Sequence, residues 1–302
     1  MVDTPVVILI YHRVAALTAD PQLLAVSREN FRAHMQHLKS NFPVLRFEDN
    51  WSDVKEPAVV VTFDDGYADN AIAALPILEE MEIPATFFVS TGNLDTTREF
   101  WWDELDKILL GDIALPESFI LRTDKGEQNW STTTQEDRRK LYQELHPLLL
   151  QLDGAGRENC IKQLSKWAGA DETGREEYRT MSFDELQRLA ESDWTTIGAH
   201  TVTHTPLSIL SRKQQHYEIF ISKGELENLT GREITTFSYP FGRKRDYSKD
   251  SVRICREAGF IKAAANFPGQ AHRWTDPFQL PRQLVRNWEI ETFAEKLQDF
   301  WI

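Results

Sequence analysis

Short apolar runs recur along the chain, and most are followed by a stretch with helical spacing. Three of these runs are continuous and rich in apolar or β-branched residues: Val6–Tyr11, Ala58–Phe63 and residues 85–90. This pattern is typical of parallel strands that are buried on both faces. Further strands are predicted over residues 44–47, Thr195–Ala199, 235–239, 263–267 and 280–285.

Helices are predicted between these runs from apolar spacing and capping residues. Ser27 can cap one helix, and Ser182 forms a capping-box pattern with Glu185 at the start of another. Pro76 is expected to kink the helix that precedes the 85–90 run, and Gly231 is a good residue to end a later helix. Helical stretches are predicted over residues 72–81, 213–229, 248–258 and 291–301.

The alternation of strands and helices predicts an α/β protein with a parallel sheet of about seven strands, most simply a barrel. Residues from about 93 to 180 break the alternation, because they are rich in charge and Trp and carry three helical patterns, over 100–110, 135–152 and 157–168. We expect a single domain over residues 1–302 with this segment as a helical insertion. Its Trp residues are expected to pack the insertion, and stacking on sugar rings or contact with a membrane surface stays an alternative.

Composition narrows the class of protein. The chain has 302 residues with 34 Lys+Arg and 47 Asp+Glu, a formal net charge of −13, which argues against a nucleic-acid partner. The longest apolar run, Val6–Tyr11, is far too short to span a membrane, and the N-terminus shows no secretory signal. Cys160 and Cys255 have no paired spacing and are expected to be reduced thiols, so we expect a cytoplasmic enzyme.

The first candidate for chemistry is Thr62-Phe63-Asp64-Asp65-Gly66, at the end of a predicted buried strand. The carboxyl ends of parallel strands are where α/β barrels place catalytic groups. Neighbouring side chains of a strand point to opposite faces, so the two acids can serve one site only if the strand breaks, which Gly66 permits. Asp-Asp-Gly is equally typical of a solvated turn.

The second candidate is His200-Thr201-Val202-Thr203-His204, which follows the Thr195–Ala199 strand. Histidines at this spacing share one face of a helical turn, as paired zinc ligands do. An isolated pair of this kind is more often structural. Combined with the two acids, however, it predicts a His-His-carboxylate set that holds a metal ion with open positions.

Two weaker signals lie at other strand ends. His12 follows the first strand and is expected at the same rim of the barrel, although such a residue taken alone is usually a core histidine. The segment from Phe237 to Gly242, with sequence Phe-Ser-Tyr-Pro-Phe-Gly, is in itself a strand followed by a turn.

Together these motifs resemble the polysaccharide deacetylases (carbohydrate esterase family 4, the NodB-homology domain). The T-F-D-D-G strand, the H-T-x-x-H turn and the Y-P-F-G strand occur in the order and approximate spacing of that family, over most of residues 5–92 and 181–290. The resemblance implies a distorted (β/α) barrel and one divalent metal ion, commonly Zn²⁺. It leaves the 93–180 insertion unexplained.

The resemblance also implies roles for individual residues. Asp65, His200 and His204 would bind the metal, and Asp64 would be the catalytic base. The Phe241 backbone N–H would occupy the oxyanion-binding position, with Tyr239 of the same segment beside the substrate.

Two departures from the family pattern require substitutes. Ser238 stands where the family has the Arg that orients the base, and Arg282 is the candidate replacement, a surface position being the alternative. The C-terminal motif that supplies the acid His is missing. Its role is assigned to His12, since the chain resembles the subgroup of poly-N-acetylglucosamine deacetylases with that His on the first strand, and His272 is the weaker alternative.

The resulting hypothesis is a metal-dependent hydrolase that removes an N-acyl group, most simply acetyl, from an amino sugar in a glycan, lipid-linked or nucleotide-linked carbohydrate. Two other readings stay open. The same site could deformylate a sugar or open a cyclic amide, or the chain could be an inactive metal- or carbohydrate-binding module. Retention of both Asp64 and His12 argues against the inactive module, because binding alone needs neither a base nor an acid.

Overall fold

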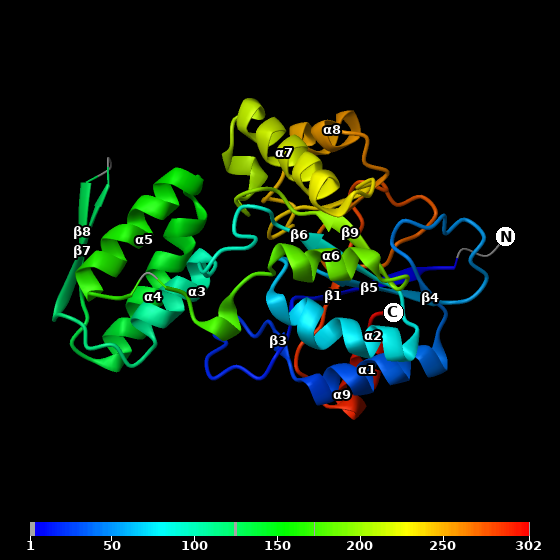
Figure 1. The fold of residues 1–302 in the computed structure, drawn as a ribbon, viewed down its shortest axis with the longest axis horizontal. Coiled ribbons are helices and arrows are strands. Elements are labelled where there is room, and N and C mark those ends of the chain that lie inside the picture. The colour runs from blue at the N-terminus through cyan, green and yellow to red at the C-terminus, as the bar shows by residue number, and fades with distance from the viewer. Residues whose placement is uncertain (1–3, 124–125, 172, 302) are drawn as a thin grey trace. The chain divides into compact units, whose positions relative to one another are not determined.

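The computed structural model describes residues 4–123, 126–171 and 173–301 (Figure 1), and the chain divides into two compact units. The larger unit contains residues up to Asp95 and from Met181 onward, and the smaller unit is Thr96–Thr180. The smaller unit thus occupies the stretch in which the strand–helix alternation fails.

A curved parallel sheet forms the larger unit. Seven of its strands follow one another in the order β11-β10-β9-β6-β5-β1-β12, and a short strand β4 pairs with β5. The bounds are β1 Val6–Tyr11, β4 Val44–Leu45, β5 Ala58–Phe63, β6 Ala85–Val89, β9 Thr195–Ala199, β10 Thr236–Ser238, β11 Lys262–Ala264 and β12 Gln283–Leu284. Outside this sheet, β2 Arg13–Val14 pairs with β3 Ala25–Val26. The predicted parallel strands are confirmed, although several are shorter than the sequence pattern suggested.

The segment that ends in β12 joins the two edges of this sheet. Leu280 makes two backbone hydrogen bonds at β11. Its N–H donates to the Ala263 carbonyl (3.1 Å), and its carbonyl accepts from the N–H of Ala265, just after the strand (2.8 Å). Immediately afterwards, β12 pairs in parallel with β1. The sheet is therefore curled into a distorted barrel, which confirms the predicted fold class.

Side-chain alternation explains why the strands are apolar on both faces. Ile8, Val60 and Phe88 belong to one core cluster, together with Leu280. Their neighbours, including Val61, pack in a second and larger cluster with the helices. A parallel strand enclosed in this way has no solvent face, hence its continuous apolar sequence.

The helices of the larger unit begin and end where local chemistry predicts. The Ser27 hydroxyl accepts a hydrogen bond from the Asn30 N–H at the start of α1, Ser182 and Glu185 form the capping box of α6, and Gly231 ends α7 in the left-handed conformation. The helices are α1 Arg28–Asn41, α2 Leu75–Met81, α6 Phe183–Glu191, α7 Arg212–Thr230, α8 Lys249–Glu257 and α9 Ile290–Asp299. The kink expected at Pro76 stays a prediction, but the helix changes type next to this residue. A π-helical turn, Asn70–Ala74, leads directly into α2, and Pro76 lies in the first turn of α2.

The smaller unit contains α3 Trp101–Leu109, α4 Gln135–Leu150 and α5 Gly154–Ala168, which are the three predicted helices. It also contains an antiparallel hairpin, β7 Ser118–Thr123 with β8 Gly126–Ser131, in a stretch expected to be a polar loop. Its tryptophans pack internally: Trp101 and Trp102 are buried, and Trp130 and Trp167 lie against Phe119. Within the described residues, no helix is both long and apolar enough to cross a membrane.

Candidate metal and catalytic site

Asp64 and Asp65 are brought to one site by a break at the end of β5. Asp64 continues the inward-facing side of the strand, and its N–H donates to the Tyr11 carbonyl of β1 (3.1 Å). Asp65 then adopts a φ of 77° and Gly66 a φ of 93°, in the left-handed region. A Cβ on Gly66 would also lie 2.9 Å from Val89 Cγ1. Glycine is therefore required at this turn, as the sequence motif indicated.

His200 and His204 follow β9 on an irregular loop, and the helical turn expected from their spacing is wrong. Thr201 and His204 have φ values of 66° and 50°. Glu218 of α7 holds the loop, because its carboxylate accepts the Val202 N–H (2.8 Å) and the Thr203 N–H (2.9 Å). Glu218 has no signal in the sequence motif, since a carboxylate on a helix is usually solvent-exposed.

Asp65, His200 and His204 form a buried cluster whose ligand atoms all lie within 4.8 Å of one another. Asp65 Oδ1 is 3.1 Å from His204 Nε2 and 3.6 Å from His200 Nε2, and the two Nε2 atoms are 3.1 Å apart. Burial alone would raise the pKa of Asp65, but hydrogen bonds from the two histidines hold it well below its usual value. An ionised carboxylate facing two imidazole nitrogens is a suitable donor set for a divalent cation.

The hydrogen bonding of His200 supports that fit. Its Nδ1–H donates to the Ser238 carbonyl oxygen (2.7 Å), which leaves the Nε2 lone pair directed at Asp65 and His204. Metal-binding histidines are oriented in this way, with one ring nitrogen on the metal and the other on a backbone oxygen. These residues would hold the metal ion through Nε2 of both histidines and a carboxylate oxygen of Asp65.

Asp64 is fixed beside this cluster by Arg282, which is fully buried and so is not the surface residue of the alternative interpretation. Arg282 donates to both carboxylate oxygens of Asp64, at 2.7 and 2.6 Å, and to the Ser238 hydroxyl (2.8 Å). The Ser238 hydroxyl in turn donates to Asp64 Oδ2 (3.1 Å). Burial would raise the pKa of Asp64, but the charges of Arg282 and His200 lower it below its usual value, so the carboxylate is ionised near neutral pH.

His12 lies at the end of β1 and is 9% exposed. Its carbonyl accepts a hydrogen bond from Asn70, and within the described residues its Nδ1 has no hydrogen-bond partner. Burial lowers the pKa of His12, although the charges of Asp65 and Asp64 oppose that effect. Burial therefore works against the charged form of the imidazole, which the two carboxylates favour.

Phe241 and Tyr239 differ in where they lie. Phe241 has a φ of 60°, and its ring makes an edge contact with the His204 ring, with centroids 4.7 Å apart. The Phe241 side chain is thus next to a proposed metal ligand. Tyr239 instead points its hydroxyl to the Phe278 carbonyl (3.0 Å) and stacks on Tyr247, so its side chain packs in the core. Its predicted place beside the substrate gains no support from these contacts.

His272 lies at the other end of β1. Its neighbour Ala271 pairs through an antiparallel β-bridge with Val6, the first residue of β1. His12, in contrast, follows Tyr11, the last residue of that strand. A strand of six residues is roughly 20 Å long, so His272 cannot contact the Asp65 cluster. Of the two candidate acids, only His12 is at the correct rim.

The sequence matches the family model for polysaccharide deacetylases over residues 52–114 and 164–262, which is more than half of the chain. The chain belongs to the polysaccharide deacetylase family. Among relatives of known sequence, it is 22% identical over 285 residues to the protein YxkH of Bacillus subtilis (strain 168), covering 92% of this chain and 70% of YxkH.

Two solved structures of similar fold cover nearly the whole chain. IcaB from Ammonifex degensii has a TM-score of 0.63 at 17% identity, over 99% of this chain and 98% of its own. The Streptococcus pyogenes deacetylase PplD, solved in complex with acetate, has a TM-score of 0.62 at 17% identity, over 97% and 98%. These likenesses concern the fold. The buried cluster of Asp65, His200 and His204, by contrast, is observed in the structure of this chain itself.

Proposed function

We propose that this polysaccharide deacetylase is a metal-dependent N-deacetylase of an amino sugar in a glycan or in a lipid- or nucleotide-linked carbohydrate, with Zn²⁺ as the resident ion. The observation that carries the proposal is the convergence of an Asp-His-His donor set with a second, separately anchored carboxylate at one rim of the barrel. A metal site alone would not require Asp64 to be held ionised in the same buried space.

Asp64 has the position and charge of a general base. Its two oxygens are fixed by Arg282, so the carboxylate stays oriented and ionised, ready to accept a proton from an attacking water. A bound divalent cation would supply Lewis-acid polarisation of the acyl oxygen and a lowered pKa for water. Arg282 is a positioning residue in this scheme, and Ser238 completes the set of donors around the base.

His12 is proposed to protonate the departing amine. It would do so from its charged form, which burial disfavours and the nearby negative charges of Asp65 and Asp64 favour. The Phe241 N–H is proposed to donate to the acyl oxygen as negative charge develops on it, and the contact of the Phe241 ring with His204 supports this assignment.

The test is acetate release from N-acetylglucosamine oligomers by zinc-loaded protein, combined with elemental analysis of bound metal. Asp64→Asn should lose at least about 100-fold in kcat and keep its metal, whereas Asp65→Ala should lose both, and Asp53→Asn, an exposed control in the same unit, should lose neither. Near-normal turnover by Asp64→Asn, or no metal retained by the wild type, would overturn the proposal.

A further inference from the structure

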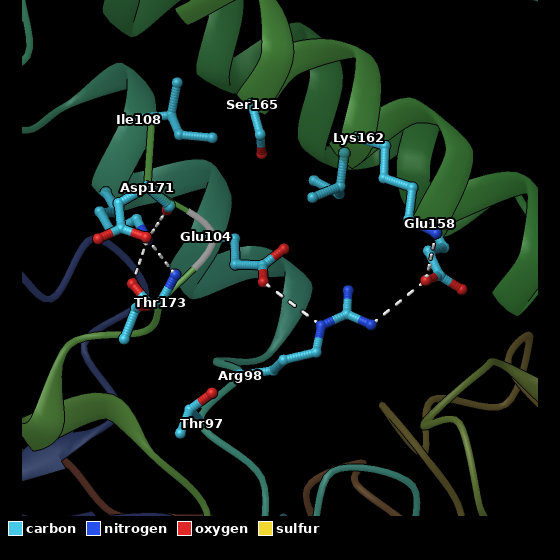
Figure 2. Close-up of a pocket in the computed structure, with 11 residues that line it drawn as sticks. Thr97, Arg98, Glu104, Ile108, Glu158, Lys162, Ser165, Asp171 and Thr173 are labelled. Carbon is cyan, nitrogen blue, oxygen red and sulfur yellow. Dashed lines mark hydrogen bonds and ion pairs between the residues drawn. The ribbon is translucent and has the colours of Figure 1, made fainter. Parts of the chain in front are cut away.

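The smaller unit contains a pocket of about 360 Å³ between α3 and α5 (Figure 2). Figure 2 shows Glu104 of α3 and Ser165 of α5 among the side chains around this space. Its other lining residues are Thr97, Arg98, Lys107, Ile108, Glu158, Ile161, Lys162, Asp171 and Thr173. None of them belongs to the metal and catalytic site described above, so the pocket is a separate feature of the chain.

Glu104 is the unusual member of this lining. It is only 8% exposed, yet within the described residues its carboxylate accepts no hydrogen bond, and its nearest cation is Arg98 Nε at 3.9 Å. Burial raises its pKa to about 7, despite the opposing charges of Arg98 and Lys107. A buried carboxylate with so little compensation is costly, and a ligand cation would relieve that cost.

The cationic side chains around Glu104 make their shorter contacts with other groups. Lys107 Nζ donates to the backbone carbonyls of Asp171 (3.0 Å) and Thr173 (2.9 Å). Lys162 pairs with Glu158 at 2.9 Å, and Arg98 reaches the same carboxylate at 3.3 Å. The lining thus contains three cationic and three anionic side chains, and the ion pair of Glu104 with Arg98, at 3.9 Å, is longer than the two ion pairs that Glu158 makes.

We propose that this pocket binds the ammonium group of an amino sugar, with Glu104 as its counter-ion and the surrounding polar side chains as partners for the ring hydroxyls. The lining suits such a ligand, because it combines an anionic group with the Ser165 and Thr97 hydroxyls and the apolar side chains of Ile108 and Ile161. Its volume falls in the range of small-molecule sites. The choice of an amino sugar among compact hydroxylated cations rests on the proposed function, since a free amine is what N-deacetylation produces.

The experiment is calorimetric titration of the full-length protein with glucosamine, N-acetylglucosamine and methylammonium. Glucosamine should bind, and Glu104→Gln should weaken that binding by roughly tenfold or more, because a hydrogen bond to a charged group is lost while the side-chain shape is kept. Glu136→Gln, an exposed control on α4 of the same unit, should bind as the wild type does. N-acetylglucosamine, which has no charge at nitrogen, should bind at least tenfold more weakly than glucosamine.

The outcomes separate this inference from the proposed function. Glucosamine binding that is unchanged in Asp65→Ala but lost in Glu104→Gln places the ligand in the smaller unit, whether or not acetate release is detected. Unchanged binding in Glu104→Gln would overturn the inference while leaving the deacetylase proposal intact. Equal affinity for methylammonium and glucosamine would overturn the assignment to a sugar.

Discussion

Arg282 offers the sharpest test of how the site is held together. It is the partner of both Asp64 oxygens, and neither side chain is more than 4% exposed. Arg282→Met keeps much of the apolar bulk of the side chain but removes the guanidinium, so the carboxylate is left buried without its cation. Arg282 Nε also donates to the Ala265 carbonyl (2.8 Å), and that bond is lost as well.

The expected cost is large because the pair is broken from one side. Removing one partner of a buried ion pair destabilises proteins by about 3–5 kcal/mol, since an uncompensated charge remains. Set against a total stability of about 5–15 kcal/mol, this is a major loss. Arg245→Met is the matched control, because Arg245 is 72% exposed on its side chain and its ion pair with Asp246 spans 3.8 Å. That variant should change stability by about 0.5 kcal/mol or less.

The assay is urea denaturation of the four proteins of a double-mutant cycle: wild type, Arg282→Met, Asp64→Asn and the double variant. The double variant should be more stable than the sum of the two single losses predicts, by about 1–3 kcal/mol, because it no longer contains an unpaired charge. A loss below about 1 kcal/mol in Arg282→Met, or strict additivity in the cycle, would refute the view that the guanidinium compensates Asp64.

Three other predictions concern single groups. Glu218→Gln should lower the affinity for zinc roughly 10- to 100-fold in a chelator competition, because the loop that carries both histidines loses its charged acceptor, and an unchanged affinity would contradict that role. The pKa of Glu104 is raised to about 7, so the stability that this group contributes is complete below its unfolded pKa and is lost as the pH rises through 7. Glu104→Gln should remove roughly 3 kcal/mol from the pH dependence of the unfolding free energy, and parallel plots of that free energy against pH for the two proteins would argue otherwise. If His12 delivers the proton, kcat/KM should fall as pH rises above a pKa lower than 6.5, and His12→Gln should abolish that limb of the profile; a limb that persists in the variant belongs to another group.

The barrel could be predicted from sequence because its strands carry a strong signal. Strands such as β1 and β5 are enclosed on both faces, so every position is apolar and the run is easily recognised. The hairpin of β7 and β8 lacks that signal. Apart from Trp130, residues Gly126–Ser131 are glycine or polar and are exposed, so the segment has no apolar run to distinguish a strand from a loop.

The candidate site was predictable to the extent that its residues end strands. Asp64, Asp65, His200 and His204 come directly after β5 and β9, and parallel strands bring such positions to one rim. Contacts across the fold had no such signal. The hydroxyl of Ser238 meets a carboxylate 174 positions away, and only the packed structure shows that it acts with the guanidinium.

The shift of the His12 pKa likewise could not be predicted from the sequence. A strand-end histidine gives no measure of its own burial, and burial determines whether the imidazole carries a charge. The same limitation applies to Glu104, which lies in a helix with an acidic first turn and appears from its sequence to be a solvated residue.

The junction of the insertion has a consequence for how such proteins can change. Asp95 donates its N–H to the carbonyl of Met181 (2.9 Å), so the chain leaves the barrel unit and returns to it at a single point. Adjacent to that point, β6 and β9 pair directly, in unbroken register from Ala85↔Thr195 to Val89↔Ala199. The segment between β6 and β9 can therefore change in length or sequence during evolution without moving the strand ends that carry the candidate site. Selection can thus act on the pocket of the smaller unit separately from the candidate site of the barrel.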